Sequence, residues 1–101
     1  ELDRAEAMAI QKIFGRGSPM PPVSSLKGHM GDFCGSGALR AAALLLSMRD
    51  EKIPPTLGLE DPEFDLDHVL ERPRDRKIQH ALLNGFSFGG SNVCLLFKKE
   101  I

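Results

Sequence analysis

The sequence lacks the residues that would define a disulfide framework or a metal centre. Its two cysteines, Cys34 and Cys94, lie far apart and form no Cys-x-x-Cys pair. The three histidines, His29, His68 and His80, do not have the spacing of metal ligands. These absences favour free thiols in a reducing compartment, which suggests a cytoplasmic protein, and they predict no metal site. We expect no cofactor.

The sequence also lacks long hydrophobic runs and any excess of charge. The longest unbroken apolar run, residues 41–46, is too short to span a bilayer, and no signal peptide is visible at the Glu-Leu-Asp-Arg start. The formal net charge is -1, and the basic clusters at 72–77 and 98–99 are short. We therefore expect neither a nucleic acid nor a membrane as a partner.

The chain has 101 residues, which suits one small globular unit or a piece of a larger one. Its first residue is Glu1, and a helical pattern begins at once, so we expect a piece of a longer protein. The hydrophobic spacing of residues 2–14 predicts a helix, and Gly15 follows it as a stop signal. Residues 23–27 predict a short strand.

A second helix is predicted over residues 38–48, which are apolar nearly all round and should be buried on most sides. Residues 56–76 have the composition of an irregular surface excursion. Two strand-like runs follow at 81–83 and 93–97, and Cys94 is expected to be buried in the second. This order of elements favours an α/β fold layered around a sheet.

The most informative stretch lies between those two runs. Residues 84–92 read Asn-Gly-Phe-Ser-Phe-Gly-Gly-Ser-Asn, far more than the roughly two residues that a plain hairpin needs. Glycine permits positive φ angles and close approach to a ligand, and rings on a loop commonly line or gate a pocket. The alternative is an ordinary loop whose rings pack back into the core. The rings and paired glycines are Phe86, Phe88, Gly89 and Gly90.

Three motifs in this order carry a resemblance to a known family. They are Asp-x-x-Glu-Ala-x-Ala leading to Ile-Phe-Gly in residues 3–15, Arg-Asp-x-x-Ile-Pro-Pro-Thr in residues 49–56, and the Asn-to-Asn stretch 84–92. Together they resemble the C-terminal part of a β-ketoacyl-acyl-carrier-protein synthase, of the condensing-enzyme (thiolase-fold) family. The last motif is similar to the family's Asn-x-Phe-Gly-Phe-Gly-Gly-x-Asn. Residues 1–101 would then be the C-terminal part of the synthase's C-terminal domain.

The resemblance implies a fold and a function. The fold is the C-terminal portion of a thiolase-like fold, with a mixed sheet, a buried central helix and helices on the faces of the sheet. The function is decarboxylative condensation of acyl and malonyl thioesters on acyl carrier protein, in fatty-acid or polyketide synthesis. The full-length protein would be a homodimer or heterodimer. The family's nucleophilic cysteine and first histidine would lie upstream, because neither Cys34 nor Cys94 matches a nucleophile motif.

The family's Lys-Ser-x-x-Gly-His-x-x-Gly-Ala-x-Gly motif fits this sequence in two registers. In the first register Lys27 is the family lysine and Asp32 stands at the second catalytic histidine. In the second register Gly28 and His29 form the Gly-His pair, two residues are inserted, and the lysine position falls on Ser24. We favour the first register because it keeps the lysine and needs the smaller change in length.

The first register has a chemical consequence. An ionised carboxylate at Asp32 would repel an enolate-like oxygen and could not serve as an oxyanion donor. Arg40 stands where the family usually has glutamate, so it either pairs with Asp32 or reaches solvent, and His29 remains a candidate substitute imidazole. A second interpretation follows, in which the protein is a non-catalytic ketosynthase-like partner of the chain-length-factor type.

The resemblance also assigns roles within the loop. Phe88 matches the ring that gates acyl access, whereas Phe86 is mainly structural within the substrate-binding loop that includes Gly89 and Gly90. Asn84 and Asn92 are expected to tie the loop through hydrogen bonds from side chain to backbone.

Overall fold

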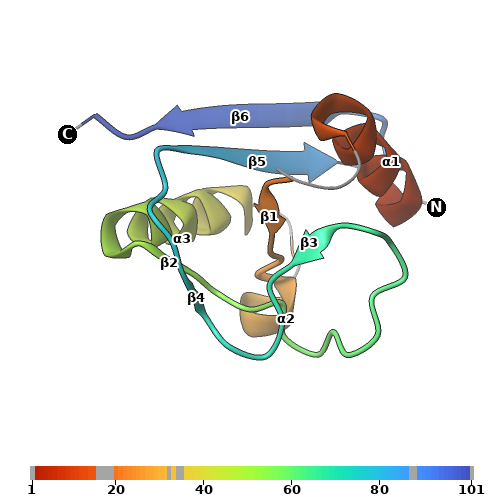
Figure 1. The fold of residues 1–101 in the computed structure, drawn as a ribbon. Helices are drawn as coiled ribbons and strands as arrows, with labels where there is room; N and C mark the ends of the chain where they lie inside the picture. The colour runs from red at the N-terminus through yellow and green to blue at the C-terminus, as the bar shows by residue number, and fades with distance from the viewer. Residues whose placement is uncertain (1, 16–19, 32, 34–35, 87–88, 101) are drawn as a thin grey trace.

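The computed structural model describes residues 2–15, 20–31, 33, 36–86 and 89–100. Figure 1 shows a long hairpin of β5 (His80–Phe86) and β6 (Asn92–Lys98) along one side of the molecule, with helix α3 (Ser36–Asp50) beneath it. Helix α1 (Leu2–Phe14) lies beside the turn of the hairpin. The fold is therefore a mixed α/β arrangement, as the sequence predicts.

Helix α1 has the bounds that the hydrophobic pattern predicts. Asp3 lies in its first turn and Lys12 in its last, which suits the helix dipole. Gly15 ends the helix with a φ of 80°, and its N–H donates to the carbonyl of Gln11 at 2.8 Å. A left-handed glycine directly after the last turn is a common way to satisfy the final carbonyls of a helix.

Helix α3 confirms the predicted second helix but corrects its expected burial. Within the described chain only Ser36 and Met48 of this helix are buried, whereas Leu39, Leu45 and Leu46 are about half exposed. The reason is geometric: β5 covers one side of the helix, and the described part of the chain supplies no second layer over its leucines.

Short strand pairs build the other half of the molecule. β1 (Pro22–Val23) pairs in parallel with β3 (Asp67–His68), and β2 (Lys52–Ile53) pairs antiparallel with β4 (Arg74–Asp75). The predicted strand at 23–27 is therefore wrong beyond Val23, because the short helix α2 (Lys27–Met30) begins at Lys27. The irregular excursion predicted at 56–76 is also wrong in part, since it contains β3 and β4.

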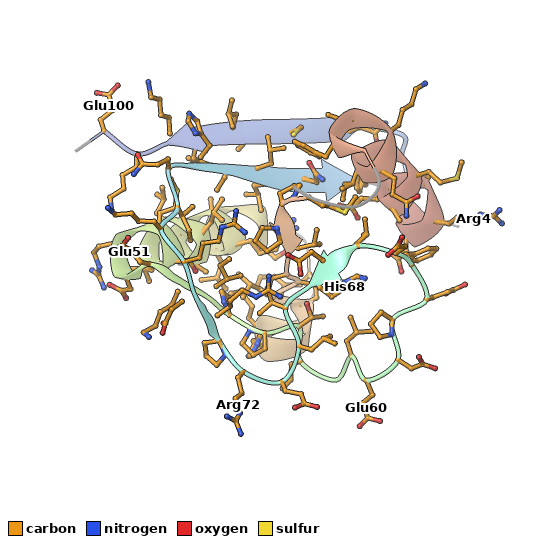
Figure 2. All side chains as sticks on the ribbon, in the orientation of Figure 1. Arg4, Glu51, Glu60, His68, Arg72 and Glu100 are labelled. Atoms are coloured by element: carbon orange, nitrogen blue, oxygen red, sulfur yellow. The ribbon has the colours of Figure 1, made fainter. Side chains whose placement is uncertain are left out.

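Val69 explains why that excursion is ordered. It is the largest fully buried side chain in the described chain, with 1% of its surface exposed. Its N–H donates to Val23 at 3.0 Å, and its carbonyl accepts from the Thr56 N–H at 2.8 Å. The excursion therefore places a core residue between β1 and the segment after β2. Figure 2 shows the neighbouring His68 near the middle of the molecule, whereas Arg4, Glu60 and Arg72 project outward.

The hairpin is longer than the sequence pattern suggests. β5 and β6 pair antiparallel from His80 opposite Lys98 to Phe86 opposite Asn92, so the predicted loop at 84–92 shrinks to the residues between these last two. Cys94 is an exposed free thiol, which corrects its expected burial. In the described chain β6 is covered too little for any of its residues from Asn92 to Leu96 to be buried.

Candidate active site

The predicted lysine and histidine lie together on α2. Lys27 is the first residue of this helix, and both side chains are exposed. The ring of His29 donates from Nε2 to the carbonyl oxygen of Pro55 at 2.8 Å. Gly31 ends the helix with a φ of 81° and donates its N–H to the Lys27 carbonyl. Asp32, the other residue of this predicted group, lies outside the described residues.

Residues 54–57, Pro-Pro-Thr-Leu, run past this helix and form what we call the proline strap. The Ser24 hydroxyl donates to the carbonyl of Pro54, and the backbone N–H of Ser25 donates to Thr56 Oγ1 at 3.0 Å. Both bonds are partly buried. The strap is thus fixed to the segment that leads into α2 before the helix begins.

The other predicted group lies at the turn of the hairpin. Phe86 is the last residue of β5 and is 46% exposed, so its ring does not pack into the core of the described chain. Gly89 and Gly90 are exposed, and Gly90 has a φ of 89°, a backbone conformation that glycine adopts at no steric cost. Asn92 opens β6 opposite Phe86. Phe88 lies outside the described residues.

Asn84 lies where three elements meet. Its side-chain amide donates to Glu6 Oε1 of α1 at 3.0 Å, and its backbone carbonyl accepts from Arg40 Nη1 of α3 at 3.3 Å. Among the described residues its side chain bonds to Glu6, and the predicted bond to the loop backbone is not tested, because residues 87–88 are not described. Asn84 joins α1, α3 and β5 just before the hairpin turn.

Arg40 is half-buried and its guanidinium points to the hairpin, so it does not simply reach solvent. Its Nε is buried and finds no hydrogen-bond partner within the described residues. A pairing with Asp32 is not tested, because Asp32 is not described. The hydrogen bond from Arg40 to the Asn84 carbonyl was not predicted from the replacement of the family's glutamate by arginine.

Figure 1 shows α2 below β1 and the hairpin of β5 and β6 above it. A hollow of about 450 Å³ runs along the strap and the loop after it. Its lining comprises residues 55–60 and Glu71 and includes none of the predicted site residues.

One ion pair connects β3 and β4. Arg74 of β4 donates to both carboxylate oxygens of Asp67 on β3, at 2.8 and 2.9 Å, and also to the His68 carbonyl. The hydrogen bond from Arg74 lowers the pKa of Asp67, and the same bond raises the pKa of Arg74. A bidentate guanidinium–carboxylate pair fixes orientation as well as charge.

Neither a metal-binding cluster nor a membrane-spanning helix is found among the described residues. Within them, no three His, Cys, Asp or Glu side chains gather closely enough to hold a metal ion. No helix formed by the described part of the chain is long and apolar enough to cross a membrane.

Sequence reasoning missed the residues that hold the predicted ones in place. Pro55 acts through its carbonyl oxygen and Glu6 acts across 78 positions of sequence. A backbone oxygen leaves no signal in residue type, and a glutamate on an amphipathic helix has the pattern of a solvated surface residue. The sequence pointed to the strap only through its Pro-Pro-Thr motif, which is one of the three motifs that carry the family resemblance.

Comparison with known proteins gives one consistent result. Residues 1–60 match the family model described as beta-ketoacyl synthase, C-terminal domain. The chain is 42% identical over 100 residues to 3-oxoacyl-[acyl-carrier-protein] synthase 2 of Synechocystis, covering 96% of this chain and 24% of that protein. It is 37% identical to the tetracenomycin polyketide synthase ketoacyl synthase beta subunit of Streptomyces glaucescens, covering 98% of this chain and 24% of that protein.

A solved structure agrees with the sequence matches. The crystal structure of a beta-ketoacyl synthase from Burkholderia phymatum superposes with a TM-score of 0.86 at 30% identity. The match covers 96% of this chain and 24% of that one. The chain therefore spans about a quarter of the length of the relatives that it matches.

Proposed function

This chain belongs to the β-ketoacyl synthase family, to whose C-terminal domain it corresponds, and we propose that its full-length protein condenses acyl and malonyl thioesters. The observation that carries the proposal is the match to 3-oxoacyl-[acyl-carrier-protein] synthase 2 along 96% of the chain. The thioesters would be carried on acyl carrier protein, in fatty-acid or polyketide synthesis. A dimer in the cytoplasm is part of the same proposal.

The chain's own contribution would be to the malonyl side and to the acyl entrance. Lys27, on α2, would organise the site in which the malonyl thioester loses carbon dioxide. The hairpin turn that follows Phe86 would line the acyl entrance, with Phe88 as the gate and Gly89 and Gly90 allowing close approach of the backbone. The acyl group itself would be accepted by a cysteine elsewhere in the protein, since covalent transfer needs an activated nucleophile and neither Cys34 nor Cys94 matches a nucleophile motif.

A second candidate is a non-catalytic partner of an active synthase. Two observations favour it: the 37% identity to a ketoacyl synthase beta subunit, and Asp32 at the family histidine position in the first register. A carboxylate beside the malonyl carbonyl oxygen would raise the barrier by charge repulsion. In this case the domain would serve assembly and chain-length control.

The test uses full-length protein and its Asp32→His variant, with malonyl decarboxylation and condensation rates as readouts. Because one oxyanion donor typically contributes about 10²–10³ in rate, Asp32→His should raise a slow wild-type rate by up to that factor. The double variant Asp32→His/Arg40→Glu tests whether the arginine must revert as well. Asp61→His, on an exposed loop, is the matched control.

The outcomes separate the candidates. A measurable wild-type rate that rises in Asp32→His supports the condensing enzyme and the first register. Rates that appear only after a second synthase subunit is added, with or without Asp32→His, support the non-catalytic partner. A robust wild-type rate that Asp32→His lowers would overturn the first register.

A further inference from the structure

His29 occupies a position that neither register explains by itself. Its Nε2 lies 2.8 Å from the Pro55 carbonyl oxygen. A carbonyl oxygen only accepts hydrogen bonds, so Nε2 carries the hydrogen and donates. The Nε2 hydrogen is therefore already engaged and is not offered to an oxyanion.

The residue before it brings the same two segments into close contact. A Cβ built on Gly28 would lie 2.8 Å from the Leu57 carbonyl oxygen and 3.0 Å from Leu57 Cβ. Atoms that close cannot coexist without a shift of the backbone, so α2 approaches the proline strap more closely than any other residue type would allow. Gly28 and His29 thus hold one face of α2 against the strap.

The strap is itself anchored and can serve as a fixed support. Thr56 donates its N–H to Val69 at 2.8 Å and accepts from Ser25 through its hydroxyl at 3.0 Å. Val69 is almost fully buried. A bond from His29 to Pro55 therefore ties α2 to a segment that is hydrogen-bonded to the buried Val69.

We propose that His29 is a positioning residue that fixes α2 on the proline strap and so holds the backbone that carries Lys27. The proposal rests on the proposed function, in which Lys27 organises the malonyl side of the site. It assigns His29 no contact with substrate. The proline strap supports this part of the site through the carbonyl groups of its two prolines and through its threonine.

The first test compares His29→Ala with His29→Gln in the full-length protein. Glutamine Nε2 is also an N–H donor and can reach the same oxygen as the imidazole Nε2. Hydrogen exchange is measured at Met30 and Gly31, whose N–H groups bond to Leu26 and Lys27 at 3.1 and 2.9 Å. His29→Ala should speed exchange and lower the decarboxylation rate by roughly three- to tenfold each, and His29→Gln should restore both.

A control variant tests whether the effect is specific to His29. His80→Ala, at the start of β5, is the matched control and should change neither readout. Unchanged exchange in His29→Ala, or a glutamine variant as impaired as the alanine variant, would overturn the proposal.

Gly28→Ala provides an independent test that leaves the imidazole intact. The added methyl group should push α2 from the strap, and it should raise exchange and lower the rate at least as much as His29→Ala does. Gly37→Ala is its control, since a Cβ there meets no atom closer than 4.0 Å. If wild-type protein neither condenses nor decarboxylates, the proposed function fails, while the exchange data from both variants still decide whether His29 fixes α2.

Discussion

Two halves of this chain, the strap half and the hairpin half, differ in whether contacts within the described chain satisfy and bury their side chains. The strap half, residues 20–31 and 51–76, is held by bonds within the chain, with Val69 buried and Ser24, Ser25 and Thr56 engaged across segments. The hairpin half, which comprises α3, β5 and β6, leaves large apolar side chains exposed, among them Leu82, Leu95 and Leu96. Polar groups can be satisfied by hydrogen bonds between neighbouring segments. An apolar face is buried only when a second layer packs against it, and the described chain does not supply that layer for the hairpin half.

The largest effect should appear when the 101 residues are expressed alone. Thirteen large hydrophobic side chains of the described residues, from Met8 to Leu96, are substantially exposed, and contiguous apolar surface drives association. We expect the isolated chain to bind ANS, to self-associate and to lack a sharp thermal transition, with full-length protein as the control. A monodisperse isolated chain that melts cooperatively without ANS binding would contradict the contrast between the two halves.

The next effect separates the two halves within the full-length protein. Leu96 is 66% exposed in this chain, and we expect the remainder of the protein to cover it, so Leu96→Ala should cost about 2–5 kcal/mol of stability. Leu57, on the strap and 56% exposed, should remain at the surface, and Leu57→Ala should cost less than about 0.5 kcal/mol. Denaturant titration of both variants measures the difference. Equal losses of stability in the two variants would show that side-chain exposure in this chain does not indicate which face the rest of the protein covers.

A smaller effect concerns the acid stability of the strap half. Arg74 lowers the pKa of Asp67, so the pair's stabilisation is fully present above the unfolded carboxyl pKa of about 3.9 and is lost as pH falls through the lower folded value. Because each side chain is 38% exposed, the contribution is at most about 1 kcal/mol. Stability measured from about pH 6 to about pH 2 should fall less steeply in Asp67→Asn than in wild type. Asp61→Asn is the control, and identical curves for all three proteins would argue against the pair.

The smallest effect belongs to the ion pair between β2 and β4. Lys52 Nζ lies 2.6 Å from Asp75 Oδ1, and this contact raises the pKa of Lys52. The two side chains are 60% and 82% exposed, however, so water and salt screen their attraction. Lys52→Ala should leave the melting temperature unchanged at low and high salt. A salt-dependent loss in this variant would show that the strap half relies on surface charge.

The sequence by itself determined the elements whose signals are local. Apolar spacing and a stop glycine fixed α1, an apolar run fixed α3, and two strand-like runs fixed the hairpin, because helix and strand periodicities depend on neighbouring residues. The Asn-to-Asn motif of residues 84–92 and the Pro-Pro-Thr motif were enough to indicate the family.

The tertiary structure alone decided how distant residues support the candidate site. It paired residues 67–68 and 74–75 in short strands and buried Val69. It also brought Asn84 within hydrogen-bond distance of Glu6, and His29 within hydrogen-bond distance of Pro55. Each of these outcomes depends on a partner far along the chain, and in two of them the partner is a backbone group that every residue carries. Residue type therefore holds no record of the pairing, which exists only once packing has brought the segments together.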